Sequence, residues 1–265
     1  MLTEEQVGDT ATSIFQAEKT RVWVTPVSNR FEHVDVTDAY RIALAVRDLK
    51  IADGRTVRGH KIGLTSKAMR EMSGATEPDY GFLYDDWIVP EGSTIEMARL
   101  NRPLVETEIA FVMGAPLSGP SVNAADVIRA TDFVLPMLEI VDSRFNTRGK
   151  NALIDSISDG ASCGFAVLGG NPVKLTDVDV RNMSASLSIN GEIQQTGSAR
   201  AVMGNPINAV AWLVNRLHEF GVPIQPGDII LSGSFIRAVP FGPGDTVLAL
   251  FDQLGEVSLS VARTK

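Results

Sequence analysis

The segment that most constrains the fold is residues 102–113, which reads RPLVETEIAFVM. It is rich in β-branched and other apolar residues and is bounded by Pro103 and Gly114, a pattern that predicts a β-strand in a core. Side chains alternate between the two faces of a strand, so Glu106 and Glu108 are expected to point the same way. The alternative is an edge strand whose polar face lies in water.

A pair of core carboxylates needs a partner. Glu106 and Glu108 would repel each other and lose hydration, whereas a divalent cation that prefers oxygen ligands would remove both costs. The second apolar run, residues 131–144, is interrupted by Glu139, which is either a charge at a strand end or a third ligand. Three carboxylates on two neighbouring strands would leave positions of an octahedral Mg²⁺ open for water and substrate.

Composition narrows the class of protein. The 265 residues suffice for one large domain or a small lobe with a main domain. A formal net charge of −8 without a basic run argues against nucleic-acid binding. Cys163 is the sole cysteine, so no intrachain disulfide can form. An acidic N-terminus and the absence of an apolar run of about 20 residues predict a cytoplasmic protein without membrane spans.

The apolar periodicity changes along the chain. Helical spacing predicts helices at residues 3–20, 35–53 and 206–221, and β-like runs predominate after residue 87. Residues 57–64 are expected to form a strand, residues 74–86 a loop, and Asn190-Gly191 a hairpin turn. The predicted fold class is therefore α+β, with a helical N-terminal region (1–75) and a mixed β-roll or sandwich domain (76–265).

Several residues could carry chemistry outside the acidic strands. Lys61, at the end of a predicted strand, could orient an anion or move a proton, although an exposed lysine is the simpler explanation. Asp79 in the predicted loop could act as an acid or base over a substrate, or only belong to a turn. Residues 155–162 form a cluster of small residues around Ser162 that could approach a ligand. The backbone at Ser234 could contact a substrate carboxylate.

Other catalytic motifs are absent from the sequence. The glycines near residue 60 fit neither a dinucleotide-binding nor a Walker pattern. None of the three histidines, at positions 33, 60 and 218, lies near a serine of the nucleophile-elbow type. If the substrate has a second carboxylate it needs a basic partner, for which Arg144, Arg148 and Lys150 are the candidates.

Four motifs in one order point to a known family. They are GHKIGLTS, EPDYG, VETEIAF and LEIVDSR, at residues 59–66, 77–81, 105–111 and 138–144. Together they resemble the hydratase/decarboxylase branch of the fumarylacetoacetate hydrolase superfamily, and the match continues through GSF, VP and GDT at residues 233–246. It extends over nearly the whole chain from about residue 35. Gly160 departs from a common Asn in relatives, and residues 145–152 match poorly.

The resemblance implies a specific site and assembly. It implies a β-roll core, a divalent cation (Mg²⁺ or Mn²⁺) held by three carboxylates, two catalytic residues in the pocket, a serine near the substrate, and homo-oligomers. The metal ligands would be Glu106, Glu108 and Glu139. Lys61 and Asp79 would lie in the catalytic pocket, and Ser162, near the substrate, is predicted to be a third catalytic residue. From the residues themselves rather than from the resemblance, Ser234 and Arg144 are the expected substrate contacts.

The resemblance also implies a reaction. The expected activity is Mg²⁺-dependent addition of water to a 2-hydroxy-2,4-dienoate, giving a 4-hydroxy-2-oxo acid in a meta-cleavage pathway for aromatic compounds. One alternative is decarboxylation of 4-oxalocrotonate, for which a complex with a partner hydratase would be expected. Another is carbon–carbon bond hydrolysis of the acylpyruvate type, and a third is a non-catalytic protein that retains the fold.

Overall fold

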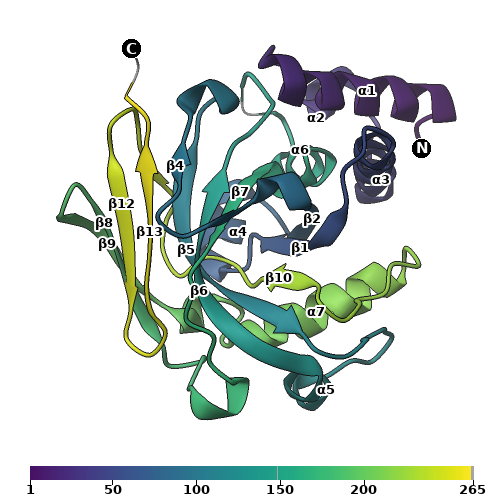
Figure 1. The fold of residues 1–265 in the computed structure, drawn as a ribbon. Helices are drawn as coiled ribbons and strands as arrows, with labels where there is room; N and C mark the ends of the chain where they lie inside the picture. The colour runs from purple at the N-terminus through teal and green to yellow at the C-terminus, as the bar shows by residue number, and fades with distance from the viewer. Residues whose placement is uncertain (148, 264–265) are drawn as a thin grey trace.

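Two β-sheets face each other, with helices around the end of the larger sheet (Figure 1). The structure is a computed structural model that describes residues 1–147 and 149–263. The larger sheet has the order β2-β1-β10-β5-β6-β7-β3, with β11 paired to β5, and the smaller has the order β4-β13-β12-β8-β9. This arrangement confirms the predicted α+β class with a helical N-terminal part and a mixed β core.

The strand bounds define the two sheets. The larger sheet contains β1 (Val57–Gly63), β2 (Asp79–Tyr84), β3 (Ile88–Pro90), β5 (Leu104–Met113), β6 (Thr131–Val141), β7 (Cys163–Leu168), β10 (Ile229–Leu231) and β11 (Val239–Pro240). The smaller sheet contains β4 (Thr94–Ile95), β8 (Ser184–Ile189), β9 (Glu192–Ser198), β12 (Thr246–Phe251) and β13 (Gly255–Val261). Strands β12 and β13 contact β6, so the smaller sheet packs against the middle of the larger one.

The helices are α1 (Glu4–Thr20), α2 (Val27–Arg30), α3 (Val36–Ala52), α4 (Lys67–Ser73), α5 (Ala124–Ala130), α6 (Ala152–Ser158) and α7 (Pro206–His218). Three of them, α1, α3 and α7, begin within a residue of the predicted starts, whereas α2, α5 and α6 were not expected from the sequence. Thr3 and Gln6 form the capping box of α1, and the Asp35 side chain accepts a hydrogen bond from the amide of Asp38 at the start of α3. No helix among the described residues is long and apolar enough to cross a membrane.

The prediction of a loop over residues 74–86 is wrong in its second half. Strand β2 occupies Asp79–Tyr84, and all six of its residues are buried. It pairs antiparallel with β1, so that Gly63 lies opposite Asp79 and Lys61 lies opposite Gly81. Pro78 and Gly81 suggested a turn, whereas the buried apolar residues of the segment and the neighbouring strand determine its structure.

The connection of β1 bears on the domain boundary. β1 lies between β2 and β10 in the larger sheet, and its pairing with β10 is parallel. The strand therefore shares a sheet with residues far beyond position 75. A division into residues 1–75 and 76–265 stays a prediction, although it separates β1 from the strands to which it is hydrogen-bonded.

The predicted hairpin at Asn190-Gly191 is confirmed, with φ values of 54° and 83° between β8 and β9.

A buried ion-pair cluster joins α1 to α3. The Glu18 carboxylate lies 2.6 Å from Lys50 Nζ and also pairs with Arg55. The Lys50 ammonium lies 3.9 Å from the centre of the Trp87 ring. Burial raises the pKa of Glu18, but the positive charges of Lys50, Arg144 and Arg55 outweigh it and lower this pKa from 4.5 to about 2. The folded state therefore favours the ionised carboxylate.

Replacing Glu18 with Gln is expected to destabilise the protein in a pH-dependent way. A depressed carboxyl pKa contributes stability that is complete above pH 4.5 and is lost as the pH falls towards 2. We expect Glu18→Gln to cost about 3 kcal/mol at pH 7, because Lys50 loses its buried partner, and the cost to shrink below pH 4.5. Urea denaturation of the wild type and of Glu18→Gln between pH 7 and pH 3 measures this difference in the free energy of unfolding.

The matched control is Glu4→Gln. Glu4 forms one ion pair with Arg41 at 2.5 Å, but its side chain is 91% exposed. Exposed pairs contribute about 1 kcal/mol or less, so this variant should change the free energy of unfolding little at any pH. A loss for Glu18→Gln that stays constant between pH 7 and pH 3 would contradict the assignment of the ion pair.

Candidate metal centre and active site

Three carboxylates meet on one face of β5 and β6. The two strands are antiparallel, with Glu106 directly opposite Glu139, and Glu108 lies two residues further along the same face of β5. Each of the three side chains offers an oxygen atom, and these oxygens lie within 4.8 Å of one another. The structure thus brings together the three acids that the alternation in residues 102–113 and the interruption at Glu139 indicated.

The charges of this acidic triad are poorly balanced by the protein alone. Burial, followed by the charge of Glu139, raises the pKa of Glu106 to about 7. The same causes raise the pKa of Glu108 well above 4.5, although the Gly233 amide donates a 2.8 Å hydrogen bond to its Oε2. Glu139 Oε2 accepts no hydrogen bond from the described residues. Crowded carboxylate oxygens of this kind fit a hard divalent cation such as Mg²⁺ or Mn²⁺.

Lys61 lies beside the acidic triad. Its Nζ is 2.9 Å from Glu139 Oε1 and donates a 2.8 Å hydrogen bond to the carbonyl oxygen of Ala161. Burial would lower the pKa of Lys61, but the charge of Glu139 and of other acidic neighbours outweighs burial, so the pKa is raised above its ordinary value. The side chain is therefore a buried ammonium at the edge of the site rather than a solvated surface lysine.

Asp79 is held on a strand rather than on a mobile loop. It is the first residue of β2, and its side chain is completely buried. Burial raises the pKa of the carboxyl group, and the nearby Lys61 charge only partly offsets this. Opposite it on β1, Gly63 makes room, because a Cβ at this position would lie 2.2 Å from Asp79 Oδ1. The position of the carboxylate thus depends on a glycine in the neighbouring strand.

Replacing Gly63 with Ala is expected to displace the Asp79 carboxylate. The clash is with the end of a side chain rather than with the backbone, so the fold should persist while turnover falls by roughly tenfold to a hundredfold. Steady-state kinetics together with a melting curve measure the two effects. The control is Gly8→Ala in α1, where nothing lies within 4 Å of the added methyl group. Wild-type turnover in Gly63→Ala would show that the position of Asp79 is not critical.

The backbone next to Ser162 has an unusual conformation. Gly160, Ala161 and Ser162 have φ values of 62°, 54° and 54°, and two consecutive non-glycine residues in the left-handed region carry strain. Asp159 holds this turn, because its Oδ2 accepts a 3.0 Å hydrogen bond from Ser162 Oγ. The turn directs the Ala161 carbonyl group towards Lys61.

Arg144 supports this turn through Asp159. Its Nε lies 2.5 Å from Asp159 Oδ1, and its Nη1 donates to the carbonyl oxygens of Asp142 and Cys163. The guanidinium is buried and is not among the residues that line the cavity described below. In this structure Arg144 contacts Asp159 and does not line this cavity, and its role as a substrate contact stays a prediction.

A cavity of about 170 Å³ reaches Glu106, one residue of the acidic triad. It brings together most of the predicted site residues, namely Lys61, Asp79, Glu106, Ser162 and Ser234. It is also lined by residues that the sequence analysis did not single out, namely Thr65, Met69, Ser156 and Ile236. Ser156 belongs to the cluster of small residues at 155–162, which was the available signal. Thr65 lies within the GHKIGLTS motif, whereas nothing singled out Met69 or Ile236.

Of the remaining basic candidates, Lys150 does not line this cavity. Lys150 is exposed, and its backbone amide donates to the Asn29 side chain. Arg148 lies outside the described residues.

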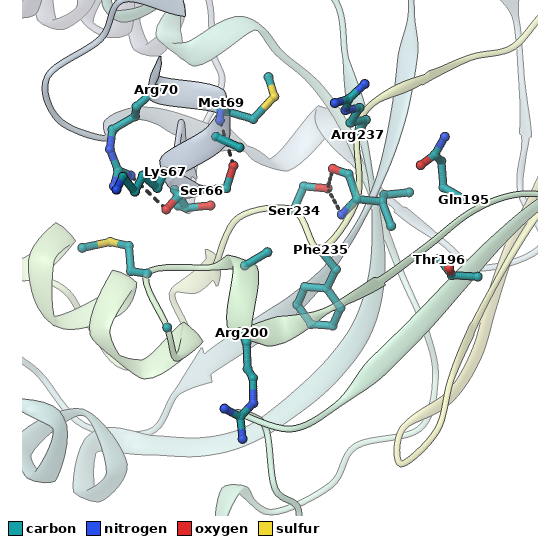
Figure 2. Close-up of a pocket in the computed structure, with 16 residues that line it drawn as sticks. Ser66, Lys67, Met69, Arg70, Gln195, Thr196, Arg200, Ser234, Phe235 and Arg237 are labelled. Carbon is teal, nitrogen blue, oxygen red and sulfur yellow. Dashed lines mark hydrogen bonds between the residues drawn. The ribbon is translucent and has the colours of Figure 1, made fainter. Parts of the chain in front are cut away.

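A second and wider cavity of about 760 Å³ adjoins the first, and Figure 2 shows the side chains around it.

Comparison with known proteins agrees with this site. The family model described as "Fumarylacetoacetate (FAA) hydrolase C-terminal" matches residues 50–262. The chain belongs to the fumarylacetoacetate hydrolase family. Within the family it is 43% identical over 248 residues to a 2-oxo-hept-4-ene-1,7-dioate hydratase of Escherichia coli, covering 92% of this chain and 93% of that protein. It is 36% identical to a 2-keto-4-pentenoate hydratase of Paraburkholderia xenovorans, with coverages of 97% and 95%.

A solved structure of this family matches the whole fold. It is the 4-oxalocrotonate decarboxylase from Pseudomonas putida G7 complexed with magnesium and adipate. The TM-score is 0.95 at 38% identity, and the match covers 98% of this chain and 99% of that one. A relative that was solved with magnesium bound thus shares the fold in which Glu106, Glu108 and Glu139 come together here.

Proposed function

We propose that this protein is a metal-dependent hydratase that adds water to a 2-hydroxy-2,4-dienoate and forms a 4-hydroxy-2-oxo acid. The observation that carries the proposal is the acidic triad, whose oxygens lie within 4.8 Å of one another beside a buried lysine and a buried aspartate. The similarity to two hydratases of 2-oxo-enoates, at 43% and 36% identity, supports this reaction class.

The acidic triad would supply the metal site. Glu106, Glu108 and Glu139 would hold Mg²⁺ or Mn²⁺, which when bound would orient the 2-oxo acid and stabilise the negative charge that develops on the 2-oxygen. In this proposal Lys61, kept protonated by its acidic neighbours, faces the same anionic region and stabilises charge or donates a proton there.

Asp79 is the proposed acid and base for the distal part of the substrate. Its raised pKa makes the carboxylate a stronger proton acceptor than an exposed aspartate, which suits removal of a proton from the attacking water. Ser162 and Ser234 line the same cavity and would donate hydrogen bonds to the substrate. Arg144 would act indirectly, by holding Asp159 and so the turn that carries Ser162.

Decarboxylation of 4-oxalocrotonate is the second candidate. It is favoured by the match to the 4-oxalocrotonate decarboxylase structure, which covers nearly all of both chains. The same charge stabilisation would serve this reaction, because the electrons left by departing carbon dioxide also develop as an enolate. The site residues alone do not discriminate between the two reactions.

The deciding experiment compares the two substrates directly. The ultraviolet absorbance of 2-hydroxypenta-2,4-dienoate and of 4-oxalocrotonate is followed with enzyme and Mg²⁺, then with a chelator, and products are identified by mass. Loss of the dienoate chromophore with gain of one water supports the hydratase. Loss of carbon dioxide from 4-oxalocrotonate without gain of water supports the decarboxylase. If neither chromophore changes, both assignments fail and acylpyruvate substrates are tested next.

We further propose that the protein works in the cytoplasm as a homo-oligomer. The proposal rests on the family resemblance, and light scattering of the purified protein tests the assembly. A stable complex with a separate hydratase, detected by co-purification, would favour the decarboxylase assignment.

A further inference from the structure

A third cavity, of about 90 Å³, lies apart from the two described above and shares no lining residue with either. Its volume suits a single small ion rather than an extended substrate. Five cationic side chains and three carboxylates line it, all within the described part of the chain. We call it the arginine cavity. The cations are Lys19, Arg21, Arg55, Arg99 and Arg144, and the carboxylates are Glu18, Asp86 and Asp142.

The three carboxylates of the arginine cavity are already engaged by other groups. Asp142 accepts hydrogen bonds of 2.7 to 3.0 Å from the backbone amides of residues 101 and 102. Glu18 pairs with Arg55, and Asp86 lies 3.4 Å from the same guanidinium. These acids therefore do not supply an ion-pair partner for the remaining arginines.

Two arginines of the cavity have no polar partner. The side chains of Arg21 and Arg99 form no hydrogen bond or ion pair with any residue that the structure describes. Arg99 is held by an apolar contact, since its guanidinium carbon lies 4.5 Å from the centre of the Phe165 ring. Burial and the charges of Arg144 and Arg99 together lower the pKa of Arg21, which shows that these cations lie close enough to repel one another.

The backbone of Arg21 indicates that its side chain has a use. Arg21 caps the end of α1 with a φ of 61°, in the left-handed region where glycine is the usual residue. A long side chain is strained in this conformation, and strained residues cluster at ligand-binding sites. An arginine at this position costs stability, which is consistent with a function of its guanidinium group.

Arg144 connects the arginine cavity with the active site. Its side chain is 4% exposed, and four of its five N–H groups have acceptors. Nη2 donates one bond, to the Asp159 carbonyl oxygen, so its second N–H group has no acceptor among the described residues. Asp159 also accepts from Ser162 Oγ at 3.0 Å. An anion at Arg144 would therefore lie behind the turn that carries Ser162.

We propose that the arginine cavity binds a small oxyanion, a phosphate or a carboxylate group, between Arg21, Arg99 and Arg144. Guanidinium groups bind such anions through paired, charge-assisted hydrogen bonds. The site is distinct from the acidic triad, and the proposal does not depend on the reaction proposed above. Because the anion binds the folded protein, it stabilises this state together with the turn at residues 159–162.

The test is a titration of the protein, in the presence of Mg²⁺, with phosphate and with acetate. The melting temperature is the readout, and chloride at equal ionic strength is the reference. We expect a saturable rise with at least one of the two oxyanions and none with chloride. A rise with phosphate alone assigns a phosphate site, and a rise with acetate alone assigns a carboxylate site. Arg99→Gln should weaken the apparent affinity at least about tenfold, because it removes a charged donor.

Arg21→Gly separates binding from folding. Glycine adopts a φ of 61° without strain, so this variant should melt no lower than the wild type when no oxyanion is present. It should nevertheless lose the saturable rise. An unchanged response of Arg21→Gly and Arg99→Gln would mean that the oxyanion binds elsewhere, for example at the metal, and would overturn the proposal. An equal response of the wild type to chloride would overturn it as well.

The matched control is Arg129→Gln. Arg129 is 78% exposed on α5, pairs with Asp126 and does not line the arginine cavity. This variant removes the same charge from the protein and should respond to both oxyanions as the wild type does. A loss of the response in Arg129→Gln would mean that net charge, not the arginine cavity, determines the effect. No substrate enters this test, so its outcome and that of the proposed function are independent.

Discussion

Replacing Glu108 with Gln is expected to abolish metal-dependent turnover, by at least about a thousandfold, while the fold remains. The amide keeps the shape of the side chain but removes a charged oxygen ligand. Because the pKa of Glu108 is raised well above 4.5, loss of its charge should not destabilise the metal-free protein. The amide oxygen can still accept the hydrogen bond of Gly233. Calorimetric titration with Mg²⁺, melting curves with and without Mg²⁺, and kinetics measure the three consequences.

The control for this variant is Glu96→Gln, an exposed acid outside the cavities. It should respond to Mg²⁺ as the wild type does. Wild-type turnover of Glu108→Gln at saturating Mg²⁺ would remove Glu108 from the ligand set, and a lower melting temperature without metal would indicate a structural role instead.

Replacing Lys61 with Met is expected to lower turnover far more than metal affinity. The Lys61 ammonium lies 2.9 Å from Glu139, so its removal makes the acidic triad more negative and should preserve or strengthen Mg²⁺ binding. If Lys61 stabilises charge or transfers a proton, turnover should fall by about a hundredfold or more. Kinetics at saturating Mg²⁺, paired with calorimetric measurement of Mg²⁺ affinity, separate the two effects.

An exposed lysine provides the comparison for Lys61. Lys174→Met removes the same charge on the surface and should leave both quantities unchanged. Unchanged turnover in Lys61→Met would exclude the residue from the mechanism. A parallel loss of turnover and of Mg²⁺ affinity would instead mean that Lys61 serves the geometry of the metal site.

The acidic triad was predictable because its signals are local. The alternation of Glu106 and Glu108 depends only on the period of a strand, and Glu139 stands out within its own apolar run. The position of Glu139 opposite Glu106 depends on the register between β5 and β6. The family motifs, not the periodicity, pointed to Lys61 and Asp79 as members of the same pocket.

What escaped prediction depends on contacts between distant segments. Residues 79–84 form a strand because they pair with β1, although Pro78 and Gly81 favour a turn. The charge of Arg144 suggested a substrate contact, but its partner Asp159 is a tertiary neighbour that no spacing rule identifies. The wider cavity of about 760 Å³ likewise combines α4, residues 195–204 and residues 234–237, which are distant in sequence.

The position of β10 has a consequence for how the protein folds. This three-residue strand is the one through which the β1–β2 pair is hydrogen-bonded to β5 in the larger sheet. Until residues 229–231 emerge from the ribosome, β1 and β5 are two unpaired edges, and Lys61 has no fixed position relative to Glu139. Such non-local pairing slows folding and exposes strand edges to aggregation. The active site thus forms only after residues 229–231 have been synthesised.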